Sequence, residues 1–231
     1  MANESDGQER KPGKRSTAWG VPAKSESRWA PRLAILVAIF LYVRLPGRYT
    51  VGPTWVVPAL ELAVFVALFA ATPLGMSTRW QRTFAVSLIA VLSVANFWSL
   101  VALVRLIVYH AKPIPGPELV DSSINIWVTN VIVFALWYWE LDRGGPDARL
   151  QAEHEPPDFL FPQMVTPAAA RPGWAPRFID YLYVAFTNAT AFSPTDTMPL
   201  TPWAKSLMLV QSLASILTVT LVAARAVNIL T

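Results

Sequence analysis

Polar side chains recur at helical spacing in the last quarter of this chain, and they are the residues best placed to do chemistry. The final apolar segment carries four of them, separated by four, three and seven residues: Gln211, Ser215, Thr218 and Arg225. This spacing places all four on one face of an α-helix. Such a face either hydrogen-bonds to a neighbouring helix or lines a wet cavity, and the sequence leaves both interpretations open.

A second polar face precedes the first, on the segment that begins at Phe178. Its members are separated by three, four and three residues: Asp180, Tyr183, Thr187 and Thr190. A turn rich in hydroxyl groups joins the two segments, so we expect the two faces to meet or to surround a shared path. The residues predicted to line this pore or cavity are Thr187, Thr190, Ser193, Thr195, Asp196, Gln211, Ser215 and Thr218.

Charged residues within apolar segments predict two structural ion pairs. A charged side chain in hydrocarbon costs about 2.5–3.5 kcal/mol, so such groups usually have partners. Glu61 and Arg105 fall about 10 Å and 6 Å from the outer ends of their segments at ~1.5 Å per residue, within reach of each other. We expect a structural pair there, in preference to a proton or ion relay. Asp180 and Arg225 form the second predicted pair, near the cytoplasmic side.

The second pair constrains the turn between the segments. Asp180 lies only ~18 Å from the end of its segment, whereas the last helix covers ~33 Å before Arg225. If both charges lie at one depth, residues 193–202 must enter the membrane as irregular chain, which requires burial by protein or access of water. The alternative places Asp180 deeper and the turn at the outer surface.

The composition identifies the bilayer as the solvent that positions these residues. Of 231 residues, 54% are hydrophobic and only 15% are charged, which is too apolar for a soluble domain of this size. Apolar runs at 33–43, 55–74, 84–109 and 124–139 precede the two C-terminal segments, with tryptophans near their ends. The sequence therefore predicts an all-α, polytopic integral membrane protein with about six hydrophobic segments, the fifth short enough to span half the bilayer.

The charges predict the orientation and the organisation of the chain. The net charge is +4, and the basic excess is concentrated in the first 32 residues, which indicates a cytoplasmic N-terminus in the plasma membrane and not a nucleic-acid partner. We expect a disordered basic tail at 1–28, four transmembrane helices within 29–142, a proline-rich cytoplasmic loop at 143–176 and a helix–elbow–helix hairpin at 177–231. Phe159, Phe161 and Met164 make the loop either a docking segment or a plain linker.

The hairpin resembles a known membrane module. Residues 187–201, TNATAFSPTDTMPLT, resemble the pore helix, filter and inner helix of tetrameric potassium channels, with Asp196 in the place of the filter's terminal Asp. With DYLYVAFT before it and ARAVNIL after it, the stretch is also similar to an uncharacterised domain-of-unknown-function family of small polytopic bacterial membrane proteins, a likeness that implies no activity.

The resemblance to potassium channels breaks down at the chemistry of the filter. A potassium filter aims rings of carbonyl oxygens with the help of glycines. No glycine lies between Trp174 and Thr231, and Pro194 fixes the backbone inside the elbow. We therefore predict that no potassium-selective filter forms.

Several chemical classes are excluded by the residues themselves. The chain has no cysteine, and its two histidines, His110 and His154, are far apart. No nucleotide-binding glycine loop, HExxH or GxSxG motif occurs. Asp180 and Asp196 flank a single segment, which does not suit an intramembrane aspartyl pair. We expect no enzyme activity, no metal and no cofactor.

Two functional hypotheses remain. The first is channel-like permeation of an ion or small solute through a homo-oligomer built on the hairpin. The alternative is a non-conducting membrane scaffold or partner subunit that docks proteins through its cytoplasmic tail and loop. A symmetric tetramer with the hairpin on its axis favours the first hypothesis, and a monomer with a dry hairpin favours the second.

Overall fold

The computed structural model describes residues 27–71, 78–109, 115–150, 155–171, 174–191 and 196–230, and most of them are helical. The confirmed fold class is all-α, with one small two-stranded sheet. The longer helices are α1 (Trp29–Val43), α2 (Val56–Ala71), α3 (Thr78–Tyr109), α4 (Gly116–Leu141), α6 (Phe178–Ala191) and α7 (Pro202–Leu230). The short elements are η1 (Gly47–Tyr49), η2 (Asp142–Gly144), η3 (Ala148–Leu150), β1 (Phe159–Leu160), α5 (Pro162–Val165), η4 (Pro167–Ala169) and β2 (Met198–Pro199). The predicted basic tail lies almost wholly outside the described residues.

Local sequence explains where the long helices begin and end. No glycine or proline occurs within α3, so its hydrogen bonds run uninterrupted. Pro202 opens α7 at a position where a missing N–H costs nothing. After α4 the backbone turns left-handed over three residues, with φ of 53° at Arg143, 78° at Gly144 and 103° at Gly145, and this turn stops the helix.

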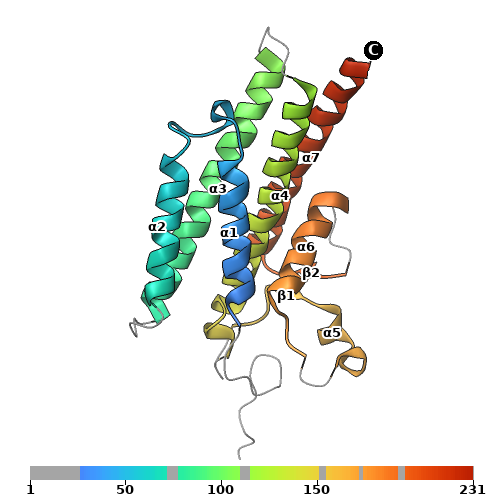
Figure 1. The fold of residues 1–231 in the computed structure, drawn as a ribbon. Coiled ribbons are helices and arrows are strands. Elements are labelled where there is room, and N and C mark those ends of the chain that lie inside the picture. The colour runs from blue at the N-terminus through green and yellow to red at the C-terminus, as the bar shows by residue number, and fades with distance from the viewer. Residues whose placement is uncertain are drawn as a thin grey trace, which may run out of the picture.

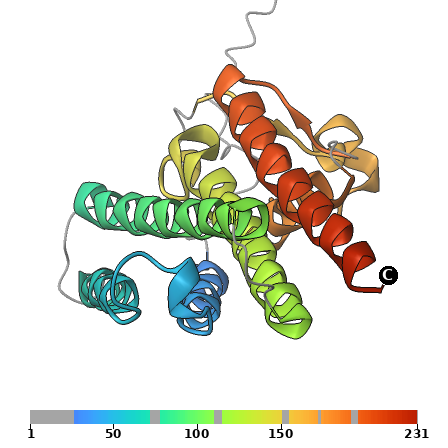
Figure 2. The ribbon, with the colours of Figure 1, turned by 90° about the horizontal axis from the view of Figure 1, so that it is seen from above.

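In the described part of the chain three helices are long and apolar enough to cross a membrane: α3, α4 and α7. α1 and the first part of α2 are shorter apolar helices. α4 is the central helix of the bundle, since it packs against α1, α3, α6 and α7 (Figures 1 and 2). Within the chain, 67% of the most apolar stretch of α4 is buried but only 22% of that of α7, so α7 presents a broad apolar face outward.

The hairpin does not cross the bundle twice. α6 starts at the same end of the bundle as α7 and stops part of the way along it (Figure 1). Its 14 residues rise ~21 Å, against ~43 Å for the 29 residues of α7. The chain then returns, and β2 pairs antiparallel with β1, Met198 opposite Leu160 and Pro199 opposite Phe159. α6 therefore covers only part of the length of the bundle, and we call the end where it begins the basal end.

For the predicted ion pair between Asp180 and Arg225 the structure describes only the Asp180 side chain, because the side chain of Arg225 lies outside the described residues. The course of the two helices nevertheless separates the two backbone positions. Asp180 lies in the first turn of α6, at the basal end, whereas Arg225 lies near the far end of α7. Along α7, Arg225 is ~35 Å from the basal start at Pro202. The Asp180 carboxylate instead accepts a hydrogen bond of 2.7 Å from the Arg177 backbone N–H and caps its own helix.

The helix directions predict that the two ends of the chain lie on opposite sides of the membrane. α1 begins at the basal end and α7 finishes at the other end (Figure 1), whereas six full crossings would return the C-terminus to the starting side. Because the chain has no cysteine, single cysteines can be introduced cleanly. We expect Lys205→Cys to react with a membrane-impermeant thiol reagent only from the cytoplasmic side, and a cysteine appended after Thr231 only from outside. Labelling of both from one side would contradict this topology.

Candidate functional site

The side-chain amide of Gln211 joins three helices. Its Oε1 accepts hydrogen bonds from the Tyr138 hydroxyl of α4 at 2.6 Å and from Asn188 Nδ2 of α6 at 2.8 Å. Its Nε2 donates to the carbonyl oxygen of Ala185 at 2.8 Å. Gln211 is fully buried, so these bonds replace water that cannot reach it.

Neighbouring polar groups extend this connection, which we call the Gln211 network. Asn188 Nδ2 also donates to the Met208 carbonyl at 2.9 Å. One turn further along α7, the Ser215 hydroxyl donates to the Ala189 carbonyl at 2.6 Å and accepts from Trp127 Nε1 of α4 at 2.7 Å. The polar face of α7 thus meets polar partners on α4 and α6 rather than a water-filled space.

The residues predicted to line a pore therefore separate into groups. Gln211, Ser215 and Thr218 are buried, and the Thr218 hydroxyl bonds to the carbonyl of Ala214 on its own helix. Thr187 and Thr190 likewise bond to carbonyls one turn back on α6, and Thr190 is exposed on its outer side. Asp196 is exposed after the elbow, while Ser193 and Thr195 lie outside the described residues. Among the described members of this set, Gln211, Ser215 and Thr218 are buried, whereas Thr190 and Asp196 are exposed, so these five do not share one environment.

The predicted pair between Glu61 and Arg105 does not form in the described part of the chain. Glu61 is fully buried in α2, and neither carboxylate oxygen has a hydrogen-bond partner there. Arg105 is exposed, between the buried Leu103 and Leu106 of α3. The depths of the two charges were compatible, but rotation about the α3 axis turns Arg105 away from the packed face.

A second polar cluster, which the sequence did not indicate, fastens the segment after α4 beneath the bundle. The Asp142 carboxylate accepts from the Tyr181 hydroxyl at 2.6 Å and from the Asp158 backbone N–H at 2.9 Å. The Asp158 carboxylate accepts from the Arg143 N–H at 2.9 Å and from Trp203 Nε1 at 2.8 Å. These bonds tie α4, α6 and α7 to one another at the basal end.

Arg149 completes this cluster from within. Its Nη1 donates to the Trp139 carbonyl at 2.7 Å, and its guanidinium carbon lies 5.6 Å and 5.5 Å from the ring centroids of Trp139 and Tyr181. The side chain is fully buried. Such a cation, held by carbonyl groups and aromatic faces, stabilises a specific chain path.

The segment predicted as a loop at 143–176 is folded where it is described. Phe159 and Phe161 are buried against aromatic rings of the same chain, including Tyr138, Tyr181 and Trp203. The described residues of 142–176, together with β2, form a unit that we call the basal cap. The basal cap is therefore not a plain linker, and its side chains Phe159 and Phe161 pack within this chain and are not available to a partner.

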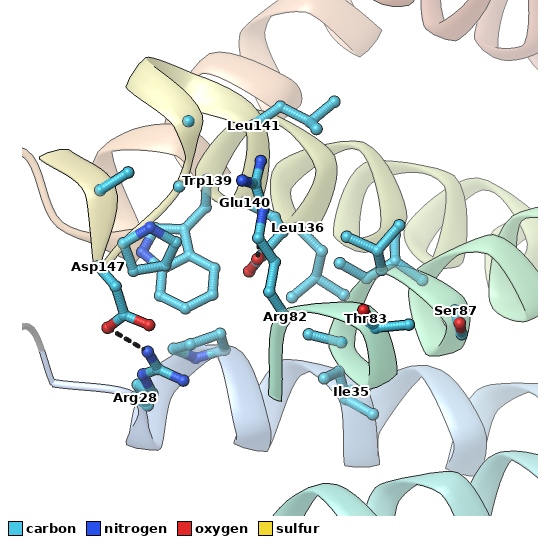
Figure 3. A pocket seen from close by; sticks show the side chains of 18 of the residues that line it. Arg28, Ile35, Arg82, Thr83, Ser87, Leu136, Trp139, Glu140, Leu141 and Asp147 are labelled. Atoms are coloured by element: carbon cyan, nitrogen blue, oxygen red, sulfur yellow. Dashed lines mark hydrogen bonds and ion pairs between the residues drawn. The ribbon is translucent and has the colours of Figure 1, made fainter. Parts of the chain in front are cut away.

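A cavity of about 600 Å³ lies beside the cap at the basal end (Figure 3). Its walls come from the starts of α1 and α3, the end of α4 and residues 144–148. Gly145 lies in one wall and has a φ of 103°. A Cβ added at this position would lie 2.8 Å from the Glu140 carbonyl oxygen. Arg28 contacts Asp147 across the mouth. Among the described residues no group of three or more His, Asp or Glu side chains could hold a metal ion.

We expect Gln211→Leu to lower the free energy of unfolding by about 2 kcal/mol, because it removes the oxygen that accepts from the buried Tyr138 hydroxyl and Asn188 amide. Unfolding in mixed micelles measures the change. The matched control is Thr190→Val, which removes a hydroxyl bonded only within its own helix and should change stability by less than about 0.5 kcal/mol. Equal effects of the two substitutions would contradict the role assigned to Gln211.

We expect Asp158→Asn to loosen the basal cap, because the Arg143 N–H and Trp203 Nε1 donate to different carboxylate oxygens, and an amide keeps only one of the two as an acceptor. Limited proteolysis of the purified protein should cut residues 142–176 at least about threefold faster, which corresponds to a loss of about 0.7 kcal/mol or more. Asp196→Asn, at an exposed carboxylate, is the control and should leave the cleavage rate unchanged. A cap that resists cleavage equally in both variants would show that Asp158 does not hold it.

Comparisons with known proteins yielded no relative. No protein-family model matches the sequence. No curated protein and no solved structure matches it either. The function therefore rests on the geometry of the chain.

Proposed function

We propose that this chain is a non-conducting, multi-pass membrane scaffold or partner subunit of the plasma membrane, with its N-terminus and basal cap in the cytoplasm. The observation that carries the proposal is the Gln211 network, which fills the space between α4, α6 and α7 with paired polar groups. A path for ions needs polar groups that face water, and these groups face one another.

The basal cap supports the same proposal. Its attachment through Asp142, Asp158 and Arg149 gives a shaped surface at the basal end in place of a mobile linker. The large aromatic residues of the cap point into the protein, whereas α5 and η4 lie at its edge and include the exposed Val165. A rigid cap of this kind suits a protein that presents a surface to others.

Permeation through an oligomer is the competing proposal, and one observation favours it. Thr190 and Asp196 are exposed in the single chain, on the hairpin that resembles a pore module. A path would then lie between copies, lined by these side chains and not by Gln211 or Ser215.

Flux through liposomes distinguishes the two proposals. We expect the reconstituted protein to pass sodium and potassium no faster than empty liposomes, and Asp196→Ala and Thr190→Val to behave identically. Gramicidin added at the end confirms that the vesicles are sealed. Flux in the wild type that falls in either variant would support permeation between copies and overturn the scaffold proposal.

A further inference from the structure

The basal cavity combines arginines at its mouth with an apolar wall. Arg79, Arg82, Thr83 and Val86 follow at steps of three, one and three residues, so one face of α3 looks into the cavity. The apolar side is formed by Ile35 of α1, Ile89 of α3 and Leu136 of α4. Polar and apolar walls that meet in one cavity suit a ligand with a charged end and a hydrocarbon end.

The charge balance of the cavity favours an anion. Four arginines line it against two carboxylates, the four being Arg28, Arg32, Arg79 and Arg82 and the two Glu140 and Asp147. Arg28 forms an ion pair with Asp147, and its Nη1 lies 3.5 Å from Gln81 Oε1. We therefore treat Arg28 as part of the cavity wall and not as a ligand-binding residue. The remaining excess of positive charge lies mainly on the α3 side.

The guanidinium groups of Arg79 and Arg82 on α3 have hydrogen-bond donors available for a ligand. Arg82 Nε lies 3.9 Å from Glu140 Oε1, which is too long for the 2.7–2.9 Å typical of a charge-assisted hydrogen bond. Within the described residues the Arg79 side chain has no ion pair or hydrogen bond, and it is exposed. Residues three apart on a helix have Cβ atoms about 5–6 Å apart, so both guanidiniums can reach one phosphate group.

The position of the cavity indicates the source of that phosphate. It lies at the end of the bundle where α1 begins, which the positive-inside rule assigns to the cytoplasmic leaflet. Basic pockets between membrane helices on this side suit anionic lipid headgroups. The apolar wall is formed by Ile35, Ile89 and Leu136, which also belong to the hydrophobic core of the bundle, and an acyl chain would lie against it.

We propose that the basal cavity is a binding site for an anionic phospholipid, with Arg79 and Arg82 on the headgroup phosphate and the apolar wall beside an acyl chain. A free phosphate ester would offer the same phosphate group as the lipid, but the apolar wall favours the lipid. Binding here does not depend on whether the hairpin conducts ions, so the flux result leaves this proposal unaffected.

The test uses the full chain in a neutral detergent and measures binding by native mass spectrometry and thermal shift. The probes are dioctanoyl phosphatidylglycerol, dioctanoyl phosphatidylcholine and glycerol 3-phosphate. We expect phosphatidylglycerol to bind at least about tenfold more tightly than either of the others. Equal binding of the two lipids would show that the site does not require an anion. Equal binding of phosphatidylglycerol and glycerol 3-phosphate would show a site for free phosphate esters. Either result would overturn the proposal.

Matched variants separate the cavity from general charge attraction. Arg79→Gln with Arg82→Gln should weaken phosphatidylglycerol binding at least about tenfold, whereas Arg171→Gln with Lys205→Gln, which removes two exposed cations at the same end, should change it less than about twofold. Equal losses would overturn the proposal. If the double variant melts early because Glu140 loses its partner, Arg79→Gln alone answers the question, because it leaves Arg82 beside Glu140. Unchanged binding in that variant would remove Arg79 from the site and overturn the proposed clamp.

Discussion

The structure depends on the pairing of buried polar groups between α4, α6 and α7. In hydrocarbon an unpaired amide or hydroxyl costs several kcal/mol, so a glutamine at the centre of α7 restricts what its neighbours can be. Tyr138 and Asn188 meet its carbonyl oxygen, and the Ala185 carbonyl meets its amide. α6 is too short to be held by a full-length apolar contact, and these bonds fix its depth and rotation against α4 and α7.

The basal cap extends this pairing to the basal end of the bundle. A helix that covers only part of the bundle needs its flanking segments secured at that end. Asp158 does this at the junction with β1, where its carbonyl accepts from Leu200 N at 2.8 Å and its carboxylate accepts from Trp203. Asp142 secures the start of α6 through Tyr181. Because Glu140 lies only two residues before Asp142, the cluster that closes the hairpin also positions one wall of the arginine-lined cavity.

Hydropathy was sufficient to predict the helical class and the approximate course of α1 to α4, because each of these helices contains an apolar run. Helical periodicity also placed Gln211, Ser215 and Thr218 on one face correctly. Periodicity could not show whether that face is in contact with water, because its hydrogen-bond partners Tyr138 and Trp127 lie on α4, far away in the sequence. The same reason explains the error at Glu61 and Arg105, where depth was predictable but rotation was not. The Asp142 and Asp158 pairing joins irregular segments and leaves no periodic signal.

The central claim is that the polar face of α7 is dry, and thiol accessibility in native membranes tests it most directly. A single Ser215→Cys in this cysteine-free chain would be exposed to a small charged methanethiosulfonate reagent from each side, with Ser206→Cys as the accessible reference on the same helix. The account predicts that position 206 reacts readily and that position 215 does not react from either side. Rapid modification of position 215 would mean that water reaches the Gln211 network and would contradict the account.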